Sequence, residues 1–413
     1  MRIAYAIQNV GIRFDEEVGD MVPVKHTLQG LQKAGHTINC FYLSGRNVVG
    51  IDNIKNLQNF YYCPQGITGT RFFRFFESGI RRVQKMLRLP YYAFFDSYRF
   101  YEACVRCLPG YDICHERQGN FSVGAAFSCL RLGIPYVLTV SSPPFLENEL
   151  FNEKPYRGVH KWVGKLEMRF IYRVAVKIIC VSESSKKQLI EDWQVDPNKI
   201  VIMPNGVDVE YFEQRNDPKS VRTKYKLESN PLIGFVGNFQ KWHGIDLLLK
   251  SFTRILEQIP DARILLVGDG PARLEIDKWI AGLNLESKVI ITGYVPRDKV
   301  SEFLDAIDVA VIPYPRFSKE LWFSPLKMYE YMAAGKAIVA SRYGQIADVL
   351  EDGRTGILVE PGDVDELTRA ILMLLNDEGL KLQLGKNAFD QAKNHHSWDR
   401  YISRLEDIYS SVI

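Results

Sequence analysis

The chain has 413 residues, enough for two or more domains that each bury a core of their own. Hydrophobic residues make up 46% and charged residues 24%, an ordinary globular composition, and the net charge of +3 gives no overall basis for binding nucleic acid. No window approaches the roughly 18 apolar residues of a membrane helix, and the first residues lack the apolar run of a signal peptide, so we expect a cytoplasmic protein.

Short apolar runs alternate with stretches of helical length in both halves of the chain, a pattern typical of parallel sheets with crossover helices. In the first half, strands are expected at 2–7, 36–43, 111–114, 135–140, 177–182 and 200–205. In the second half, they are expected at 232–237, 262–268, 288–293, 309–314, 336–341 and 356–360. Six strands in each half predict an α/β protein with two doubly wound, Rossmann-like parallel-sheet domains that face a cleft, where the active site should lie.

A polar and poorly patterned stretch separates the two halves. Near the end of the chain, apolar residues recur at spacings of four and three, which predicts an amphipathic helix with one buried stripe. We therefore predict domains at 1–207 and 231–395, a linker at 208–230, and a C-terminal helix at 396–413 that returns to pack on the first domain.

Seven cysteines, an odd number without a secretory signal, predict reduced thiols. Cys104 and Cys107 form a Cys-x-x-Cys pair, but no second pair or nearby Cys/His cluster completes a tetrahedral zinc site. The cysteines are therefore expected to be mainly buried structural thiols.

Residues 71–100 hold seven Arg or Lys against Glu77 and Asp96, and ten of these thirty residues are aromatic. Basic residues interleaved with Phe and Tyr suit the surface of an anionic membrane. The alternative is that these residues form ordinary helices of the first domain, with buried aromatic rings and solvated arginines. Both interpretations remain open from the sequence.

Two turns that contain glycine follow strands of the second half. Around Gly237, the loop carries Lys241 and His243, and such a loop lets the backbone approach a phosphate while basic side chains supply charge. The run 268–271, Gly-Asp-Gly-Pro, forms a second tight turn. Each turn taken alone is also compatible with a plain connection between a strand and a helix.

A helix is expected at 325–334, with Ser324 as N-cap and Pro325 as its first residue. Its N-terminus follows the strand at 309–314 and offers free N–H groups to an anion. Lys327 lies in the first turn, where a cation is unfavourable against the helix dipole unless an anion offsets it. A simple surface pair between Lys327 and Glu330 is the alternative.

Five segments then carry a resemblance to a known family: PNGVD at 204–208, VGNFQKWHG at 236–244, LLVGDGP at 265–271, TGYV at 292–295 and PLKMYEYMAAGKAIVAS at 325–341. In this order and spacing they resemble the retaining glycosyltransferases of the GT-B fold, in the large family that includes sucrose synthase and bacterial mannosyl- and glucosyltransferases. The resemblance covers nearly the whole chain and is stronger in the second half.

The resemblance implies that the second domain binds a sugar-nucleotide donor and the first a hydroxyl acceptor, with retention of anomeric configuration and without a metal or other cofactor. Guanine-using relatives tend to place an acid where Arg297 stands, which favours UDP. The acceptor is expected to belong to bacterial envelope, exopolysaccharide or glycolipid synthesis, with a lipid-linked acceptor at the inner face of the membrane suggested by 71–100. No nucleic-acid partner is expected.

The resemblance also assigns residues. Glu330 matches the glutamate that holds the donor ribose, and His115 matches the first residue of a His-x-His-like segment. The catalytic candidates are Glu116, Arg117, Lys327 and Glu320. The donor-binding candidates are Gly237, Asn238, Lys241, His243, Gly268, Gly270, Tyr294, Val295, Ser324, Pro325, Leu326 and Glu330. The acceptor-side candidates are Gly19, Asp20 and His115.

Two positions depart from the family pattern in ways that bear on catalysis. Trp322 stands where the family has a glutamate directed at the sugar, so either Glu320 or backbone N–H groups near Ser324 would replace it. Arg117 stands where a second histidine is usual, and a structural ion pair between Glu116 and Arg117 is the alternative to a catalytic role.

The rival functions are a UDP-sugar epimerase of the same fold and a sugar-nucleotide-binding protein without catalysis.

Overall fold

The computed structural model describes residues 1–8, 21–52, 59–86, 93–119, 122–151, 156–213 and 218–413. The chain divides into two compact units, one formed by Met1–Pro204 with Tyr401–Ile413 and the other by Asn205–Arg400. The segment 208–230 clusters with the second unit and carries helices there, whereas the end of the chain clusters with the first. No helix within the described ranges is long and apolar enough to cross a membrane.

Unit 1 is built on an eight-stranded sheet in the order β4-β3-β2-β1-β5-β6-β7-β8. Its strands are β1 (Arg2–Ile7), β2 (Thr37–Ser44), β3 (Asn47–Ile51), β4 (Phe60–Tyr62), β5 (Ile113–Arg117), β6 (Tyr136–Val140), β7 (Lys177–Cys180) and β8 (Ile200–Ile202). Its helices are α1 (Met21–Lys33), α2 (Arg71–Met86), α3 (Phe94–Cys107), α4 (Gly124–Leu132), α5 (Pro144–Phe151), α6 (Gly158–Val174), α7 (Glu183–Glu191) and most of α17 (Trp398–Ser410).

All six strands expected in the first half are present and parallel, but β3 and β4 add an antiparallel edge that the sequence did not predict. β5 also begins later than expected. Asp112 lies before the strand, where its Oδ2 accepts a hydrogen bond from the backbone N–H of Arg2 at 2.6 Å. The strand therefore extends forward through Glu116 and Arg117, two of the candidate site residues.

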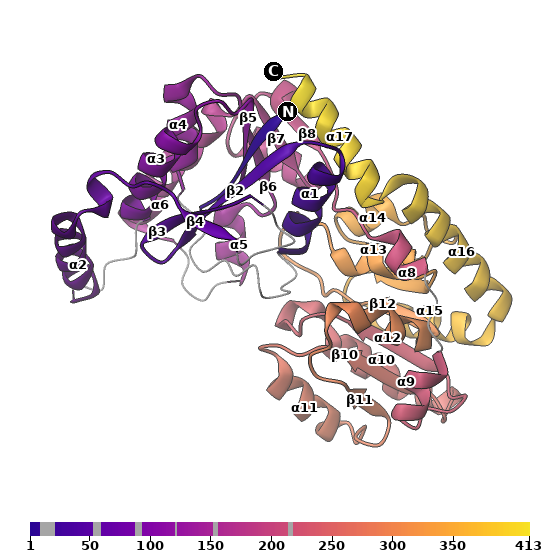
Figure 1. Cartoon of the computed structure of the whole chain (residues 1–413). Coiled ribbons are helices and arrows are strands. Elements are labelled where there is room, and N and C mark those ends of the chain that lie inside the picture. The colour runs from indigo at the N-terminus through magenta and orange to yellow at the C-terminus, as the bar shows by residue number, and fades with distance from the viewer. Residues whose placement is uncertain (9–20, 53–58, 87–92, 120–121, 152–155, 214–217) are drawn as a thin grey trace. The chain divides into compact units, whose positions relative to one another are not determined.

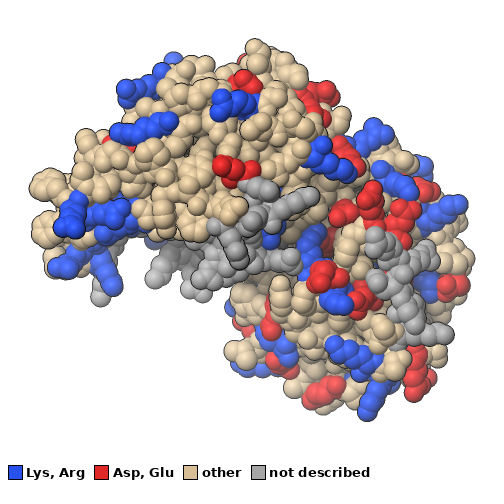
Figure 2. All heavy atoms as spheres, viewed as in Figure 1, with Lys and Arg blue, Asp and Glu red and all other residues tan. Residues whose placement is uncertain are grey.

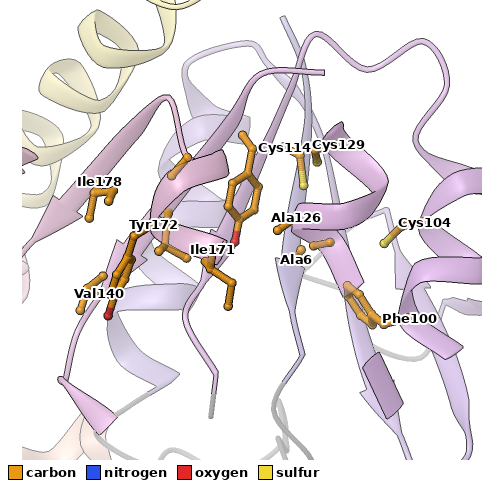
Figure 3. Close-up of a cluster of buried hydrophobic side chains, with 14 of the residues drawn as sticks. Ala6, Phe100, Cys104, Cys114, Ala126, Cys129, Val140, Ile171, Tyr172 and Ile178 are labelled. Atoms are coloured by element: carbon orange, nitrogen blue, oxygen red, sulfur yellow. The ribbon is translucent and has the colours of Figure 1, made fainter. Parts of the chain in front are cut away.

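Helices cover both faces of the unit 1 sheet. On one face, side chains of α3, α4 and α6 pack against the strands, including Phe100, Ala126 and Ile171 (Figure 3). On the other face, α1 and α17 supply the core, and α17 contributes Ile402, Leu405, Ile408 and Tyr409. The amphipathic stripe expected at the end of the chain is thus confirmed as a buried face.

Unit 2 has a fully parallel six-stranded sheet in the order β11-β10-β9-β12-β13-β14 (Figure 1). Its strands are β9 (Leu232–Val236), β10 (Arg263–Val267), β11 (Val289–Ile291), β12 (Val309–Ile312), β13 (Ala337–Ser341) and β14 (Ile357–Val359). Its helices are α8 (Val209–Glu213), α9 (Pro218–Lys224), α10 (Ile245–Gln258), α11 (Arg273–Gly282), α12 (Val300–Ala306), α13 (Leu326–Ala333), α14 (Gln345–Val349), α15 (Val364–Asn376) and α16 (Glu378–His395).

The six strands of unit 2 lie where the sequence predicted them, because a strand covered on both faces reads as a nearly continuous apolar run. The strand order reverses beside β9, where β10 lies on one side and β12 on the other. At such a switch point the connections leave in opposite directions and open a crevice beyond the carboxyl ends of the strands. The corresponding reversal in unit 1 lies between β1 and β5.

A buried ionic cluster fastens α2 to α3 in unit 1. Arg99 is fully buried and contacts Glu77 at 2.7 Å and Asp96 at 2.8 Å. Arg81 also contacts both carboxylates, at 2.7 and 3.2 Å. The side of α2 that carries Glu77 and Arg81 therefore faces inward.

Replacing Arg99 by Met should leave Glu77 and Asp96 without their buried partner, with the partly exposed Arg81 beside both and Arg46 at 3.7 Å from Glu77. Because an unpaired buried charge is costly, we expect Arg99→Met to lower the free energy of unfolding by about 3–5 kcal/mol. Urea denaturation would measure this. The control is Lys161→Met, which removes an exposed partner of Glu149 in the same unit and should cost less than about 1 kcal/mol. Equal stability of the two variants would contradict the assigned role of the cluster.

Candidate active site

The carboxyl ends of β9 and β10 come together through backbone contacts that only glycine permits. Gly268, which follows β10, has φ 140°, and a Cβ atom there would lie 2.0 Å from the carbonyl oxygen of Gly237. Gly270 lies directly against Asn238 and Phe239. The two predicted glycine turns are therefore a single packed structure that leaves little side-chain bulk over the end of the sheet.

His243 holds the loop that follows β9. Its Nδ1 donates to the carbonyl oxygen of Asn238 at 2.5 Å, and its ring stacks on Tyr314 with centroids 5.7 Å apart. Burial, followed by the nearby positive charge of Lys327, lowers the pKa of His243 well below its usual range. The imidazole is thus neutral, and Nδ1 must carry the proton because a carbonyl oxygen only accepts.

Helix α13 is aligned on β9 by a buried tyrosine. The hydroxyl of Tyr331 accepts a hydrogen bond from the backbone N–H of Val236 at 2.8 Å. The helix begins at Leu326, and Pro325 is its N-cap residue with no side-chain hydrogen bond. The prediction that Ser324 caps the helix was wrong. The Ser324 hydroxyl instead accepts from the backbone N–H of Asn205 at 3.1 Å, and Asn205 Nδ2 donates to the Ser324 carbonyl at 2.9 Å.

Lys327 is the most unusual charged residue of the site. Its side chain is buried, and its Nζ has no hydrogen-bond partner among the described residues. The ammonium lies 4.1 Å from the ring centroid of Phe235, on β9, and 5.7 Å from that of Tyr314, which follows β12. A Cβ atom added to Gly237 would lie 3.3 Å from the Lys327 Nζ, so a glycine at this position leaves room for the ammonium. Lys327 therefore stands at the switch point of the sheet, in the first turn of a helix.

The environment of Lys327 opposes its positive charge. Burial lowers the pKa of Lys327 to about 7, and the carboxylate of Glu330 offsets only part of that effect. The aromatic faces below it supply some cation–π attraction, but no carboxylate is paired with it directly in the described structure. An anion placed beside Nζ and the free N–H groups of α13 would complete the arrangement.

Glu330 lies one turn further along α13 and is nearly buried. Its Oε1 contacts Nη2 of Arg297 at 3.1 Å. The surface pair between Lys327 and Glu330 that the spacing left open is therefore not what the structure contains. Arg297 precedes α12 and follows Tyr294 and Val295, which line a cavity of about 440 Å³ in unit 2.

Several other predicted residues lie apart from this arrangement. Lys241 is largely exposed and contacts Glu275 at 2.6 Å, so its charge is already partnered. Glu320 is exposed, before α13. Trp322 is buried, at 2% exposure, and its ring lies edge-on to that of Phe323, with centroids 6.0 Å apart. Whether Glu320 replaces the glutamate that Trp322 displaces stays a prediction.

The unit 1 candidates end β5 beside the other switch point. Arg117 is half-buried at the carboxyl end of the strand, and Glu116 is fully buried with its Oε2 accepting from the Tyr136 hydroxyl at 2.5 Å. Burial raises the pKa of Glu116 to about 8. A structural ion pair between Glu116 and Arg117 is not what the structure shows, because adjacent residues of a strand point to opposite faces.

His115 is placed under the C-terminal helix. Its Nδ1 pairs with the Tyr409 hydroxyl at 2.5 Å and its Nε2 with the Thr139 hydroxyl at 2.6 Å. Burial lowers the pKa of His115 to about 3, so the ring is neutral. An acceptor-side role for His115 stays a prediction. The other two acceptor-side candidates, Gly19 and Asp20, lie outside the described residues.

Two family profiles match the chain. The profile described as "Glycosyl transferases group 1" matches residues 230–377, and the profile described as "Glycosyltransferase Family 4" matches residues 24–211. The sequence is 27% identical to an uncharacterized glycosyltransferase of Methanocaldococcus jannaschii, over 73% of this chain and 76% of that protein. It is 25% identical to an Escherichia coli UDP-Gal:alpha-D-GlcNAc-diphosphoundecaprenol alpha-1,3-galactosyltransferase, over 73% of this chain and 76% of that one.

Among solved structures, the fold is similar to that of Anabaena HepE in complex with UDP, with a TM-score of 0.71 at 16% identity over the full length of both chains. This similarity, together with the two sheets described above, confirms the predicted GT-B fold class.

The pKa of Lys327 predicts how pH changes stability in the protein without ligand. Since the folded pKa of about 7 lies below the ordinary value of 10.5, the unfolded chain binds more protons between these values and stability should rise with pH across them. Lys327→Met should therefore raise the melting temperature clearly at pH 6.5 and less at pH 9. Differential scanning calorimetry at both values would measure this, with Lys250→Met, at an exposed position of α10, as control. A gain that does not depend on pH would contradict the assigned environment.

Proposed function

This chain belongs to the glycosyl transferases of group 1, and from that premise we propose that it moves a hexose-type sugar from UDP to a hydroxyl acceptor, with retention of anomeric configuration and without a metal ion. The observation that carries the proposal is the buried ammonium of Lys327 at the N-terminus of α13, over the switch point of unit 2. A diphosphate is an anion of the right charge for that place.

The choice of UDP rests on three observations. The structurally similar HepE is in complex with UDP, and the Escherichia coli relative is named for a UDP-galactose donor. Arg297 stands where an acid would favour guanine, and in this chain it contacts Glu330 through Oε1. In the proposal, Arg297 fixes Glu330 so that Oε2 accepts hydrogen bonds from the ribose hydroxyls, while Tyr294 and Val295 lie toward the base.

The chemistry follows from where charge develops. As the bond between the sugar C1 and the diphosphate oxygen breaks, negative charge grows on that oxygen, and Lys327 with the N–H groups of α13 stabilises it. The acceptor oxygen forms its bond to C1 on the same face. Its proton passes to the departing phosphate oxygen, so atoms and charge balance without an enzyme nucleophile. Lys327 supplies positive charge that a metal ion would otherwise provide.

In this proposal, unit 1 binds the acceptor. Glu116 and Arg117 end β5 beside the reversal of strand order, where ligands of such sheets bind. The Escherichia coli relative is named for a diphosphoundecaprenol-linked acceptor, and residues 71–100 combine aromatic and basic side chains. Both favour a lipid-linked acceptor, in bacterial envelope, exopolysaccharide or glycolipid synthesis.

Nucleotide binding tests the donor site. UDP should raise the melting temperature of the protein more than GDP or ADP does, because only UDP is expected to satisfy both the base and the diphosphate sites. Lys327→Met should abolish the shift because it removes the cation that binds the phosphates. Glu330→Gln should reduce the shift because it weakens the hydrogen bonds to the ribose hydroxyls. Lys250→Met, an exposed lysine of the same unit, is the matched control and should keep the full shift. A larger shift with GDP would overturn the choice of UDP.

Transfer itself tests the catalytic proposal. With a panel of UDP-sugars and polyprenyl-diphosphate sugars, the wild-type protein should release UDP and form an α-linked product from an α-linked donor. Lys327→Met should lower kcat by about 10²–10³, as expected for loss of one group that stabilises the developing charge. EDTA should leave the rate unchanged. Product of inverted configuration would refute retention, and nucleotide binding without turnover on any pair would favour a binding protein.

A further inference from the structure

Helix α2 presents large apolar side chains to solvent. Its strongly exposed apolar residues are Phe72 at 81%, Phe75 at 81%, Phe76 at 53%, Val83 at 48% and Met86 at 73%. Ile67, on the 3₁₀ turn that packs against α2, is 59% exposed as well. Single exposed apolar residues are normal, but a contiguous group of this size marks an interaction site.

The spacing of these residues places them on one stripe of the helix. Counted from Phe72, they follow at three, four, eleven and fourteen residues, with Gly79 between them at seven. At 3.6 residues per turn these positions fall within a single face of about 100°. The exposed cations Arg71, Arg82 and Lys85 lie beside this stripe, along one edge.

The opposite face of α2 carries Glu77 and Arg81 and packs inward, whereas the apolar stripe faces solvent, which inverts the usual arrangement of a surface helix. Glu77 is fully buried against Arg99, while only Phe73 among the phenylalanines of α2 packs inward, on Phe95 and Tyr98. All three acidic residues of 71–107 are buried: Glu77, Asp96 and Glu102. The exposed surface of this region therefore carries cations and apolar groups without carboxylates, as Figure 2 shows for the visible face of the part of unit 1 that holds α2.

We propose that α2 docks the protein on an anionic lipid bilayer. The phenyl rings of Phe72, Phe75 and Phe76 enter the boundary between headgroups and acyl chains, and the cations along the edge meet lipid phosphates. The helix lies in the plane of the interface. Within the described part of 71–100, the exposed apolar stripe lies on α2, whereas Phe95, Arg99 and Phe100 are buried in unit 1.

A second copy of the chain is a poorer occupant of this surface. In a twofold dimer the same patch would face itself, so Arg71, Arg82 and Lys85 would meet cations with no exposed carboxylate of the region to offset them. An anionic bilayer satisfies the apolar stripe and the cations together. Docking itself needs neither a sugar donor nor turnover. The inference rests on the proposed function only for the purpose of docking, which is to bring a lipid-linked acceptor to unit 1.

Co-sedimentation with vesicles tests the proposal. The wild-type protein should bind vesicles of phosphatidylcholine with phosphatidylglycerol far more tightly than phosphatidylcholine alone, and less at high salt. The double variant Phe72→Ser with Phe75→Ser should lose at least about tenfold in apparent affinity. The triple variant Arg71→Gln, Arg82→Gln and Lys85→Gln should lose the preference for phosphatidylglycerol. All these side chains are exposed, so the melting temperatures should stay unchanged.

The matched control is Trp162→Ser with Leu166→Ser, which removes two exposed apolar residues of α6 in the same unit, at 63% and 44% exposure. This control should bind vesicles as the wild type does. No binding of the wild type to anionic vesicles, or equal loss in the control, would overturn the proposal. So would a lipid-free dimer that Phe72→Ser with Phe75→Ser converts to monomer, since a second copy would then cover α2. A UDP-induced shift measured on the same samples reports the donor site separately.

Discussion

A lysine ammonium surrounded by aromatic rings and backbone has a high free energy until an anion joins it. In this protein the ammonium of Lys327 lies over Phe235 and Tyr314, and the neighbouring elements are arranged around that position. Tyr331 aligns α13 on β9, and His243 folds the loop of β9 back on itself as a neutral ring. The unfavourable charge is thus maintained by the fold, and the diphosphate of the proposed donor would meet an ammonium group that has already lost its water.

The two units use one architecture for different purposes. In unit 2, the switch point beside β9 carries a cation, glycine turns and a helix N-terminus, which together suit a phosphorylated ligand. In unit 1, the reversal between β1 and β5 carries Arg117 and a buried Glu116 whose pKa is raised, and α2, the helix proposed to dock on lipid, lies on the same unit. A water-soluble donor and a membrane-bound acceptor would need such a division.

The parallel strands could be predicted from the sequence because burial on both faces leaves each as an apolar run, as in "LIGFV" and "RILLV". The edge strand β4 carried no comparable pattern, since it is three exposed residues long. β3, "NVVGI", is a short buried apolar run that was not assigned as a strand. Lys327 and Glu330 were predicted as site residues from the sequence, but the residues that contact them were not. Phe235, Tyr314 and Arg297 come from other elements, and only the tertiary fold brings them to α13.

The N-cap of α13 shows the same limit at a smaller scale. Ser324 followed by Pro325 is good local capping chemistry, yet the hydroxyl of Ser324 is occupied by the backbone of Asn205. The inverted face of α2 could not be read from composition either. The sequence shows that phenylalanines and arginines alternate in 71–86, whereas the buried contacts of Glu77 with Arg99 decide which of them face water.

The position of α17 has a consequence for how the chain acquires its structure during synthesis. Ile402, Leu405 and Tyr409 fill the core of unit 1, and Tyr409 pairs with His115 in the middle of its sheet. These residues leave the ribosome only after the whole of unit 2. The core of the unit that is translated first is therefore completed last. Until then, the apolar face that α17 covers is accessible to chaperones and prone to aggregation.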